Sequence, residues 1–327
     1  MRISRRVRAA IGIIALSALA ACSGTESPPA AGGDKAAGPE KTEITVGVLP
    51  VPDNSAVFIA QQRGFFKEEG LSVKTEIIQG GAAAIPSLLS GTLDVSMTNY
   101  VSAFIAAGRG NKIKIITDLY QAGPDVFNII AAKDSAISSV ADLKGKKIAV
   151  NTLNNIGTLA VTATLKAGGL TAEDVQFVEL PLPNMSGALQ KGQIDAAWTT
   201  EPFLTGAAKD IGARKIADTM TGPLAGFPIA GLSATSDFTE KYPKTLAAFQ
   251  RAVAKAQQIV AADRKAVEEV LPTYTKIDAA TAAAIRLGTF PTGLDPQRLQ
   301  RVADVMLEQK YLETAIDAKT IVAGSGG

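Results

Sequence analysis

The 327-residue sequence contains no histidine and only one cysteine, Cys22. No imidazole is therefore available as a general base, proton relay or metal ligand, and neither an internal disulfide nor a multi-cysteine zinc site can form. The usual nucleophile–base pairs of hydrolytic enzymes are missing for the same reason. We therefore expect a protein that is not an enzyme, with no catalytic residues, no bound metal and no cofactor.

The sequence also lacks a charge excess and a long apolar run. It has 33 Lys and Arg against 31 Asp and Glu, and four of the arginines lie within residues 1–8. A nearly neutral body without a basic block gives no electrostatic reason to expect nucleic-acid binding. Hydrophobic residues make up 46% of the chain, so a disordered chain is excluded and a folded core is expected.

The N-terminal segment has the layout of a bacterial export signal. Basic residues 1–8 precede an apolar run over residues 9–20, which is too short to span a membrane and suits a signal-peptide core. The sequence Leu19-Ala20-Ala21-Cys22 resembles the lipobox of bacterial lipoproteins. We therefore expect a signal peptide over 1–21, lipidation of Cys22 and a flexible tether over 22–42. This predicts a protein anchored to the outer face of the bacterial cytoplasmic membrane. General secretion is favoured, although Ser4-Arg5-Arg6 leaves the twin-arginine route open.

Beyond residue 43 the pattern alternates between short apolar runs and amphipathic stretches. It predicts strands over 44–49, 72–78 and 93–97, with a helix over 55–69 that ends at Gly70. A second series follows from residue 146, and residues 240–312 are mainly helical. The alternation predicts an α/β protein with mostly parallel sheets flanked by helices.

An internal repeat supports two similar units. Leu88-x-x-Gly91-x-Leu93-Asp94-Val95 matches Leu189-x-x-Gly192-x-Ile194-Asp195-Ala196 at an offset of 101 residues. In both copies a helix ends at a glycine and the chain enters a strand at once. We expect Asp94 and Asp195 to anchor these turns and not to bind a ligand.

Two similar α/β units predict a crevice at the carboxyl ends of their strands, where open α/β sheets bind ligands. This rule nominates paired loops at 50–56 and 151–158, at 79–83 and 182–186, and at 98–101 and 199–203. Helix starts in these loops favour anions or acceptors, but the same residues could simply cap helices or fill the core. The ligand-binding candidates are Asp53, Asn54, Ser55, Gly80, Gly81, Thr98, Asn99, Asn154, Asn155, Thr158, Asn184, Trp198, Glu201 and Phe227.

Several ordered segments, spanning about residues 43–235, resemble the substrate-binding proteins of ABC importers in the nitrate/sulfonate/taurine and thiamine-pyrimidine-precursor group. They are Val46–Pro50, Phe58–Leu71, Gly91-x-x-Asp94, Val140–Val150 and Gly192-x-x-Asp195 with the following Trp198-x-x-Glu201-Pro202.

The resemblance implies a two-lobed type II periplasmic-binding-protein fold. Lobe 1 would comprise 43–126 plus 229–327 and lobe 2 would comprise 127–228, with a hinge at crossover strands near 127–131 and 228–232. It also implies a monomer that closes on a small molecule and delivers it to an ABC permease and ATPase. Two alternatives stay open: a pyrimidine-precursor synthase, disfavoured because the eukaryotic enzyme uses its own histidine, and an extracellular sensory domain.

The nominated loops contain Asp53 and Glu201 but no Lys or Arg. A multiply charged anion normally recruits arginine, so a phosphate-bearing ligand is not expected. A monoanion, a taurine-like zwitterion, or a neutral or amine-bearing heterocycle stacked on Trp198, Tyr100 or Phe227 all remain open.

Overall fold

The computed structural model describes residues 38–324. Cys22, the predicted signal peptide and most of the predicted tether lie outside the described residues. The end of the tether is part of the folded body, because the Glu40 carboxylate accepts hydrogen bonds from the amides of Lys244 and Thr245 at 3.1 and 2.9 Å. The Lys41 amide donates to Thr245 Oγ1 at 2.9 Å. The attached chain therefore begins a few residues before the predicted boundary at residue 42.

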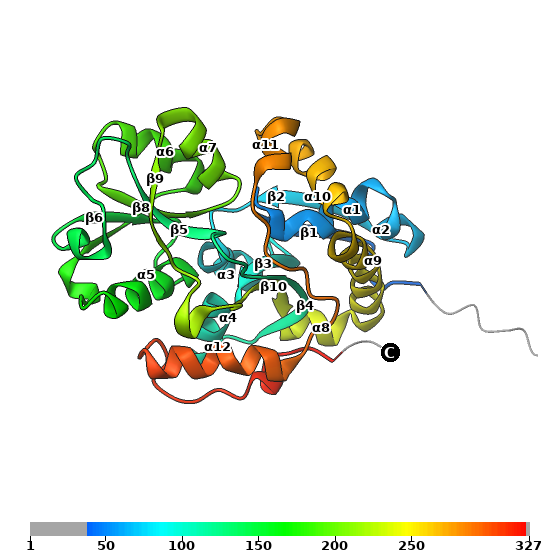
Figure 1. Cartoon of the computed structure of the whole chain (residues 1–327). Coiled ribbons are helices and arrows are strands. Elements are labelled where there is room, and N and C mark those ends of the chain that lie inside the picture. Colours follow the sequence, from blue (N-terminus) through cyan, green and yellow to red (C-terminus); the bar gives the residue numbers. More distant parts are fainter. Residues whose placement is uncertain (1–37, 325–327) are drawn as a thin grey trace, which may run out of the picture. The chain divides into compact units, whose positions relative to one another are not determined.

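Two five-stranded sheets form the core of the described body (Figure 1). The strand order of the first is β2-β1-β3-β10-β4 and that of the second is β7-β6-β8-β5-β9, so the two sheets have the same layout. In each, three parallel strands continue into an antiparallel strand that the chain reaches from the other sheet. The predicted α/β class and the repeat are both confirmed by this topology. The strands are β1 (Glu43–Val48), β2 (Ser72–Ile77), β3 (Val95–Asn99), β4 (Ile113–Gln121), β5 (Phe127–Ala131), β6 (Lys147–Val150), β7 (Gln176–Glu179), β8 (Ala196–Thr200), β9 (Arg214–Asp218) and β10 (Pro228–Thr235).

Helices pack on both sheets and on one another. In the first, α3 lies against β3, α4 against β4 and β10, and the long α9 against β4, α1 and α2; in the second, α5, α6 and α7 all contact β8. The helices are α1 (Ser55–Gln62), α2 (Phe65–Glu68), α3 (Gly81–Leu89), α4 (Tyr100–Gly108), α5 (Ile156–Ala167), α6 (Leu182–Gln190), α7 (Phe203–Ile211), α8 (Ser236–Lys241), α9 (Pro243–Ala262), α10 (Arg264–Val270), α11 (Ala279–Ala284) and α12 (Pro296–Glu308).

The helix predicted over 55–69 is two helices, α1 and α2. They are separated at Gly64, whose φ of 77° lies in the left-handed region that only glycine enters without strain. The sequence pattern continues through the break because Phe65 and Phe66 are buried like the apolar residues of α1.

The two repeated aspartates do what the repeat predicts. Asp94 Oδ2 accepts the Thr45 amide at 3.0 Å, and Asp195 Oδ2 accepts the Lys147 amide at 2.8 Å. Each carboxylate thus ties the start of one strand to the start of its parallel neighbour, and both strands begin slightly later than expected. The structural role of both aspartates is confirmed.

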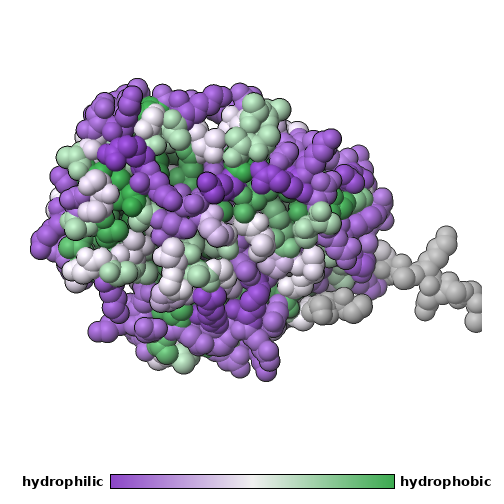
Figure 2. All heavy atoms as spheres, viewed as in Figure 1, coloured by the Kyte–Doolittle hydropathy of each residue, from purple (hydrophilic) through white to green (hydrophobic). Residues whose placement is uncertain are grey.

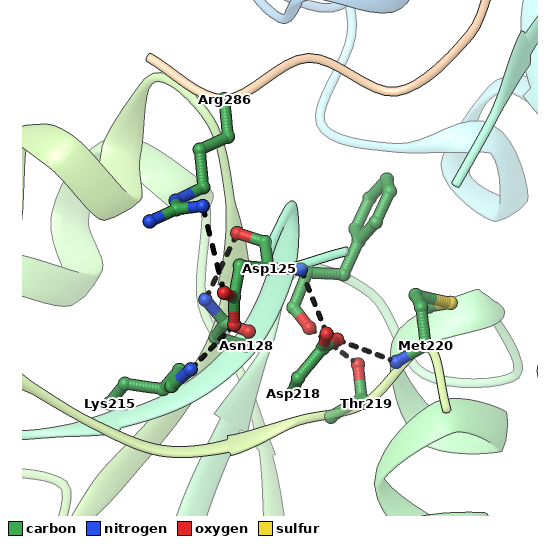
Figure 3. A network of polar contacts seen from close by, with 8 residues as sticks. Asp125, Asn128, Lys215, Asp218, Thr219, Met220 and Arg286 are labelled. Carbon is green, nitrogen blue, oxygen red and sulfur yellow. Dashed lines mark hydrogen bonds and ion pairs between the residues drawn. The ribbon is translucent and has the colours of Figure 1, made fainter. Parts of the chain in front are cut away.

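The chain passes between the sheets twice, through 122–126 and 219–227. The two segments lie side by side, and the Ala122 amide donates a hydrogen bond to Phe227 O at 2.9 Å. Figure 3 shows the polar network at this crossing. The Asp218 carboxylate accepts the amides of Asp125 and Met220, at 2.8 and 2.9 Å. Asp125, at a φ of 60°, pairs with Lys215 at 2.6 Å and with Arg286 at 3.7 Å. Arg286 belongs to the segment 285–294, which leads from α11 to α12.

Hydrophilic and apolar residues are interspersed on the face drawn in Figure 2. No helix within residues 38–324 is both long enough and apolar enough to cross a membrane.

Candidate functional site

A cavity of about 40 Å³ lies where the ends of the two sheets meet. Loops from both sheets enclose it, and they approach closely: a Cβ atom placed on Gly80 would lie 2.7 Å from Asn151 Nδ2 of the opposite sheet. The Asn151 side chain also donates to Gln79 O at 3.3 Å across the same gap. The cavity is lined by Leu49, Val51, Asp53, Gly80, Gly81, Met97, Asn99, Phe127, Asn151, Asn155, Ile156, Leu182, Trp198, Thr200 and Ile229.

Six of the predicted ligand-binding residues line this cavity, and they come from five of the nominated loops and strand ends. Because parallel strands deliver their carboxyl ends to one edge of a sheet, residues that are far apart in the sequence meet here. The six are Asp53, Gly80, Gly81, Asn99, Asn155 and Trp198.

Asp53 is the acidic group of the site. Its side chain is only 3% exposed, and Oδ1 has no hydrogen-bond partner among the described residues. Burial, which disfavours the charged carboxylate, raises the pKa of Asp53 to about 7. Its charge also acts on the buried hydroxyls of Tyr120 and Tyr274, where it helps to raise the tyrosine pKa values, although burial is the larger cause there.

Trp198 forms a rigid aromatic wall. Its Nε1 donates to Thr219 Oγ1 at 3.0 Å, and its ring stacks on Phe127 with centroids 5.6 Å apart. On the other side, a Cβ atom on Gly157 would approach the ring to 2.7 Å, so glycine is needed there for the helix to pack. The ring is 2% exposed and held on three sides.

The helix starts at the cavity differ in how they are capped. Asn99 Oδ1 accepts the Ser102 amide at 2.9 Å and caps α4, and Asn155 caps α5 through Ile156. In contrast, α3 begins at Gly81 and its N-cap residue, Gly80, has no side chain to cap it, so its first amides are available to an acceptor. Gly81 is required by space, because a Cβ atom there would lie 2.7 Å from the Asn99 amide nitrogen.

Asn151 and Thr200 were not among the predicted ligand-binding residues, although both lie in nominated loops. Asn151 Oδ1 and Thr200 Oγ1 are buried without a hydrogen-bond partner among the described residues, and both side chains line the cavity. Asn151 directly follows β6 and Thr200 is the last residue of β8. A position at the carboxyl end of a parallel strand could therefore have identified both as ligand-binding candidates. Within the nominated loop at 151–158, Asn154, Asn155 and Thr158 were predicted, and of these only Asn155 lines the cavity.

Glu201 does not line the cavity. Its carboxylate accepts the Thr205 amide at 3.1 Å, the Thr205 hydroxyl at 2.9 Å and the Arg286 amide at 3.2 Å. Burial raises the pKa of Glu201, and these hydrogen bonds oppose the rise. The Glu201 side chain thus joins the end of β8 to the segment 285–294.

The remaining predicted residues also lie outside the cavity lining, and three of them are used in the core. Asn54 Nδ2 donates to Leu49 O at 3.0 Å, Ser55 Oγ lies 3.0 Å from Tyr274 Oη, and Thr98 Oγ1 lies 2.6 Å from Ser233 Oγ.

The last four predicted residues have other surroundings. Phe227 is fully buried and lies under the Arg301 guanidinium, 5.8 Å from the ring centroid. Asn184 is exposed. Asn154 and Thr158 line a separate groove of about 580 Å³ between α4, α5 and residues 310–314.

The charges around the cavity are one-sided. Among the described residues that line it, Asp53 carries the only formal charge and there is no Lys or Arg. Within residues 38–324, no three His, Cys, Asp or Glu side chains are grouped so that they could hold a metal ion.

The sequence matches a known protein family and is similar to two solute-binding proteins. The profile of the NMT1-like family matches residues 37–273. The chain is 29% identical over 195 residues to a taurine-binding periplasmic protein of Escherichia coli (strain K12), a match that covers 59% of each chain. It is 26% identical over 297 residues to a putative aliphatic sulfonates-binding protein of Bacillus subtilis (strain 168), covering 86% of this chain and 85% of that one. The first match thus spans less than two thirds of its relative.

Among solved structures, the alkanesulfonate-binding protein SsuA of Xanthomonas axonopodis pv. citri, bound to MOPS, superimposes with a TM-score of 0.73 at 19% identity. The match covers 87% of this chain and 99% of that one. The periplasmic-binding-protein fold expected from the sequence is therefore confirmed, as is the resemblance to this group.

Proposed function

Because the chain belongs to the NMT1-like family, we propose that it is an extracytoplasmic solute-binding protein that captures a small molecule between two lobes and delivers it to an ABC importer. The observation that carries the proposal is the cavity enclosed by loops of both sheets. The named functions of the two relatives, taurine binding and sulfonate binding, support it.

We assign the two lobes to residues 43–126 plus 229–327 and to 127–228. Each would consist of one sheet with its helices, joined by the crossings at 122–126 and 219–227. A ligand that touches both lobes stabilises the state in which they are closed, because only that state offers both sets of contacts. A permease can then distinguish the loaded receptor by its shape.

Binding without turnover fits the residues of the chain. The sequence has no histidine and its only cysteine is Cys22, so the histidine-dependent chemistry of the related pyrimidine-precursor synthase is not open to it. The cavity side chains Asn99, Asn151 and Thr200 can hold a solute through hydrogen bonds. We therefore assign a binding role and no reaction.

Membrane attachment is the second part of the proposal. Cys22 would carry the lipid and residues 23–39 would link it to the folded body. A lipid anchor keeps the receptor beside its importer on the outer face of the membrane without a spanning helix.

The test is to incubate the purified Cys22→Ser protein with taurine, ethanesulfonate, nitrate and 4-aminopyrimidine. Calorimetry would measure binding, and small-angle X-ray scattering would measure closure. We expect one bound molecule per chain, a more compact particle, and recovery of the solute chemically unchanged. Product formed in more than stoichiometric amount would contradict a receptor function, as would binding without any change in scattering.

A further inference from the structure

The cavity contains polar atoms whose hydrogen-bonding capacity is unused. They are Asp53 Oδ1, Asn151 Oδ1 and Thr200 Oγ1, each buried without a partner among the described residues. Carboxylate and amide oxygens only accept hydrogen bonds, and a hydroxyl can accept as well as donate. Leaving such atoms unpaired costs free energy, so they indicate a molecule that brings hydrogen-bond donors.

Asn151 Nδ2 donates to Gln79 O at 3.3 Å, whereas its Oδ1 is buried without a partner among the described residues. Asn151 Oδ1 is therefore an acceptor, and Asp53 Oδ1, from the other sheet, is one whenever the carboxylate is ionised.

The nearby cations are engaged elsewhere. Arg298 pairs with the buried Asp118 and donates to Gln121 Oε1 at 3.0 Å. Arg286 pairs with Asp125 at the crossing between the sheets. A plain anion in the cavity would thus meet the Asp53 carboxylate with no Lys or Arg among the described lining residues to offset it, and it would depend on neutral donors such as the uncapped amides at the start of α3.

Apart from Asn99 and Asn155, whose side chains cap helices, the rest of the lining carries no polar side chain and includes a flat aromatic surface. This surface is Trp198, which stacks on Phe127, and the apolar residues Leu182, Ile156 and Met97 also line the cavity. Such a lining favours a small ligand with an apolar or aromatic body.

From these observations we infer that the ligand is a small amine, whose amino group is bound by Asp53 with Asn151 and Thr200, and whose body packs on Trp198. The inference rests on the proposed solute-binding function and narrows its ligand class. It separates amino-heterocycles and amino-sulfonates from simple sulfonates and nitrate. An acidic group, where the ligand has one, would face the uncapped start of α3.

Two matched pairs of compounds test the amine directly. Taurine differs from ethanesulfonate, and 4-aminopyrimidine from pyrimidine, by the amino group. We expect the purified Cys22→Ser protein to bind at least one amine at least about 30-fold more tightly than its amine-free partner, as expected for a buried charged hydrogen bond. Asp53→Asn should abolish this difference, Thr200→Val should reduce it, and Asp210→Asn, on the exposed end of α7, should leave it unchanged.

The outcomes separate the inference from the function on which it rests. Binding of ethanesulfonate or nitrate as tightly as the amines, with closure by X-ray scattering, would overturn the amine and keep the receptor. Amine binding that is unchanged in Asp53→Asn would overturn the assignment to Asp53. If neither amine binds, the inference falls, and scattering with the two anions then decides whether the receptor function falls with it. Should Asp53→Asn not fold, Thr200→Val and Asn151→Ala decide the assignment.

Discussion

Replacing Asp53 with asparagine removes the one carboxylate among the described residues that line the cavity, and the burial of that group gives the size of the effect. Burial raises the pKa of Asp53 from 3.8 to about 7. In the unfolded chain the group loses its proton near its usual pKa, whereas in the folded protein it keeps the proton until about pH 7. The folded state thus binds more protons between these values, and the free energy of unfolding falls as the pH rises.

Since one pKa unit corresponds to about 1.4 kcal/mol, Asp53 destabilises the ligand-free protein by about 2 kcal/mol at pH 5 and by about 4 kcal/mol at pH 8. The loss is absent below pH 3.8 and complete above about pH 7. Asp53→Asn should therefore raise the free energy of unfolding, and should raise it more at pH 8 than at pH 5. The neighbouring titratable groups, Tyr100, Tyr120 and Tyr274, have their pKa values raised by burial and stay neutral throughout this range.

Urea unfolding at pH 5, 6, 7 and 8 would measure this difference for the Cys22→Ser protein with and without Asp53→Asn. Asp210→Asn is the control, because that carboxylate is exposed. A stability gain that is equal at pH 5 and pH 8, or a loss at pH 8, would contradict the raised pKa of Asp53. Either result would mean that Asp53 is paired or hydrated in the free protein.

Three further changes probe other parts of the account. Cys22→Ser should move the protein from the membrane to the soluble fraction, and retention after a salt wash would place the anchor elsewhere. Gly81→Ala should lower the free energy of unfolding, measured in urea, by about 1–3 kcal/mol, because its Cβ would lie 2.7 Å from the Asn99 amide nitrogen. Gly187→Ala is the control, because a Cβ there would meet nothing within 4 Å. Equal effects of the two changes would contradict the close packing at Gly81. Glu201→Gln should lower the free energy of unfolding by about 1–3 kcal/mol, because both carboxylate oxygens accept hydrogen bonds and the NH2 end of a glutamine amide cannot. Affinity for the amine probes should stay unchanged, and a selective loss of affinity would show that Glu201 contacts the ligand.

Much of the fold could be read from local patterns. The repeat around Asp94 and Asp195 predicted two equivalent units because each aspartate acts on a backbone amide at a fixed place in the unit. Strand β9 (Arg214–Asp218) was not predicted. It is a charged edge strand whose pairing with β5 is long-range, so its apolar pattern is weak. The break at Gly64 was hidden because buried apolar residues follow it at once, at Phe65 and Phe66.

The candidate site was predictable to the level of loops but not of side chains. Chain order determines which loops meet at the ends of parallel strands, and therefore Asp53 and Trp198 were found. Which side chain of a loop faces the cavity depends on partners far away in the sequence. Glu201 is occupied by the amide of Arg286, 85 residues later, and Phe227 is covered by Arg301.

The fluorescence of Trp198 can show whether a small molecule binds between the two sheets, and chemical recovery of that molecule shows whether it leaves unchanged. Trp198 is the only tryptophan in the sequence and lines the cavity, so its emission reports on this site alone. Titration with taurine and with 4-aminopyrimidine should change the emission saturably for at least one of them, with one molecule bound per chain by calorimetry and full recovery of the compound. Calorimetric binding that leaves the Trp198 emission unchanged would place the ligand elsewhere and contradict the account.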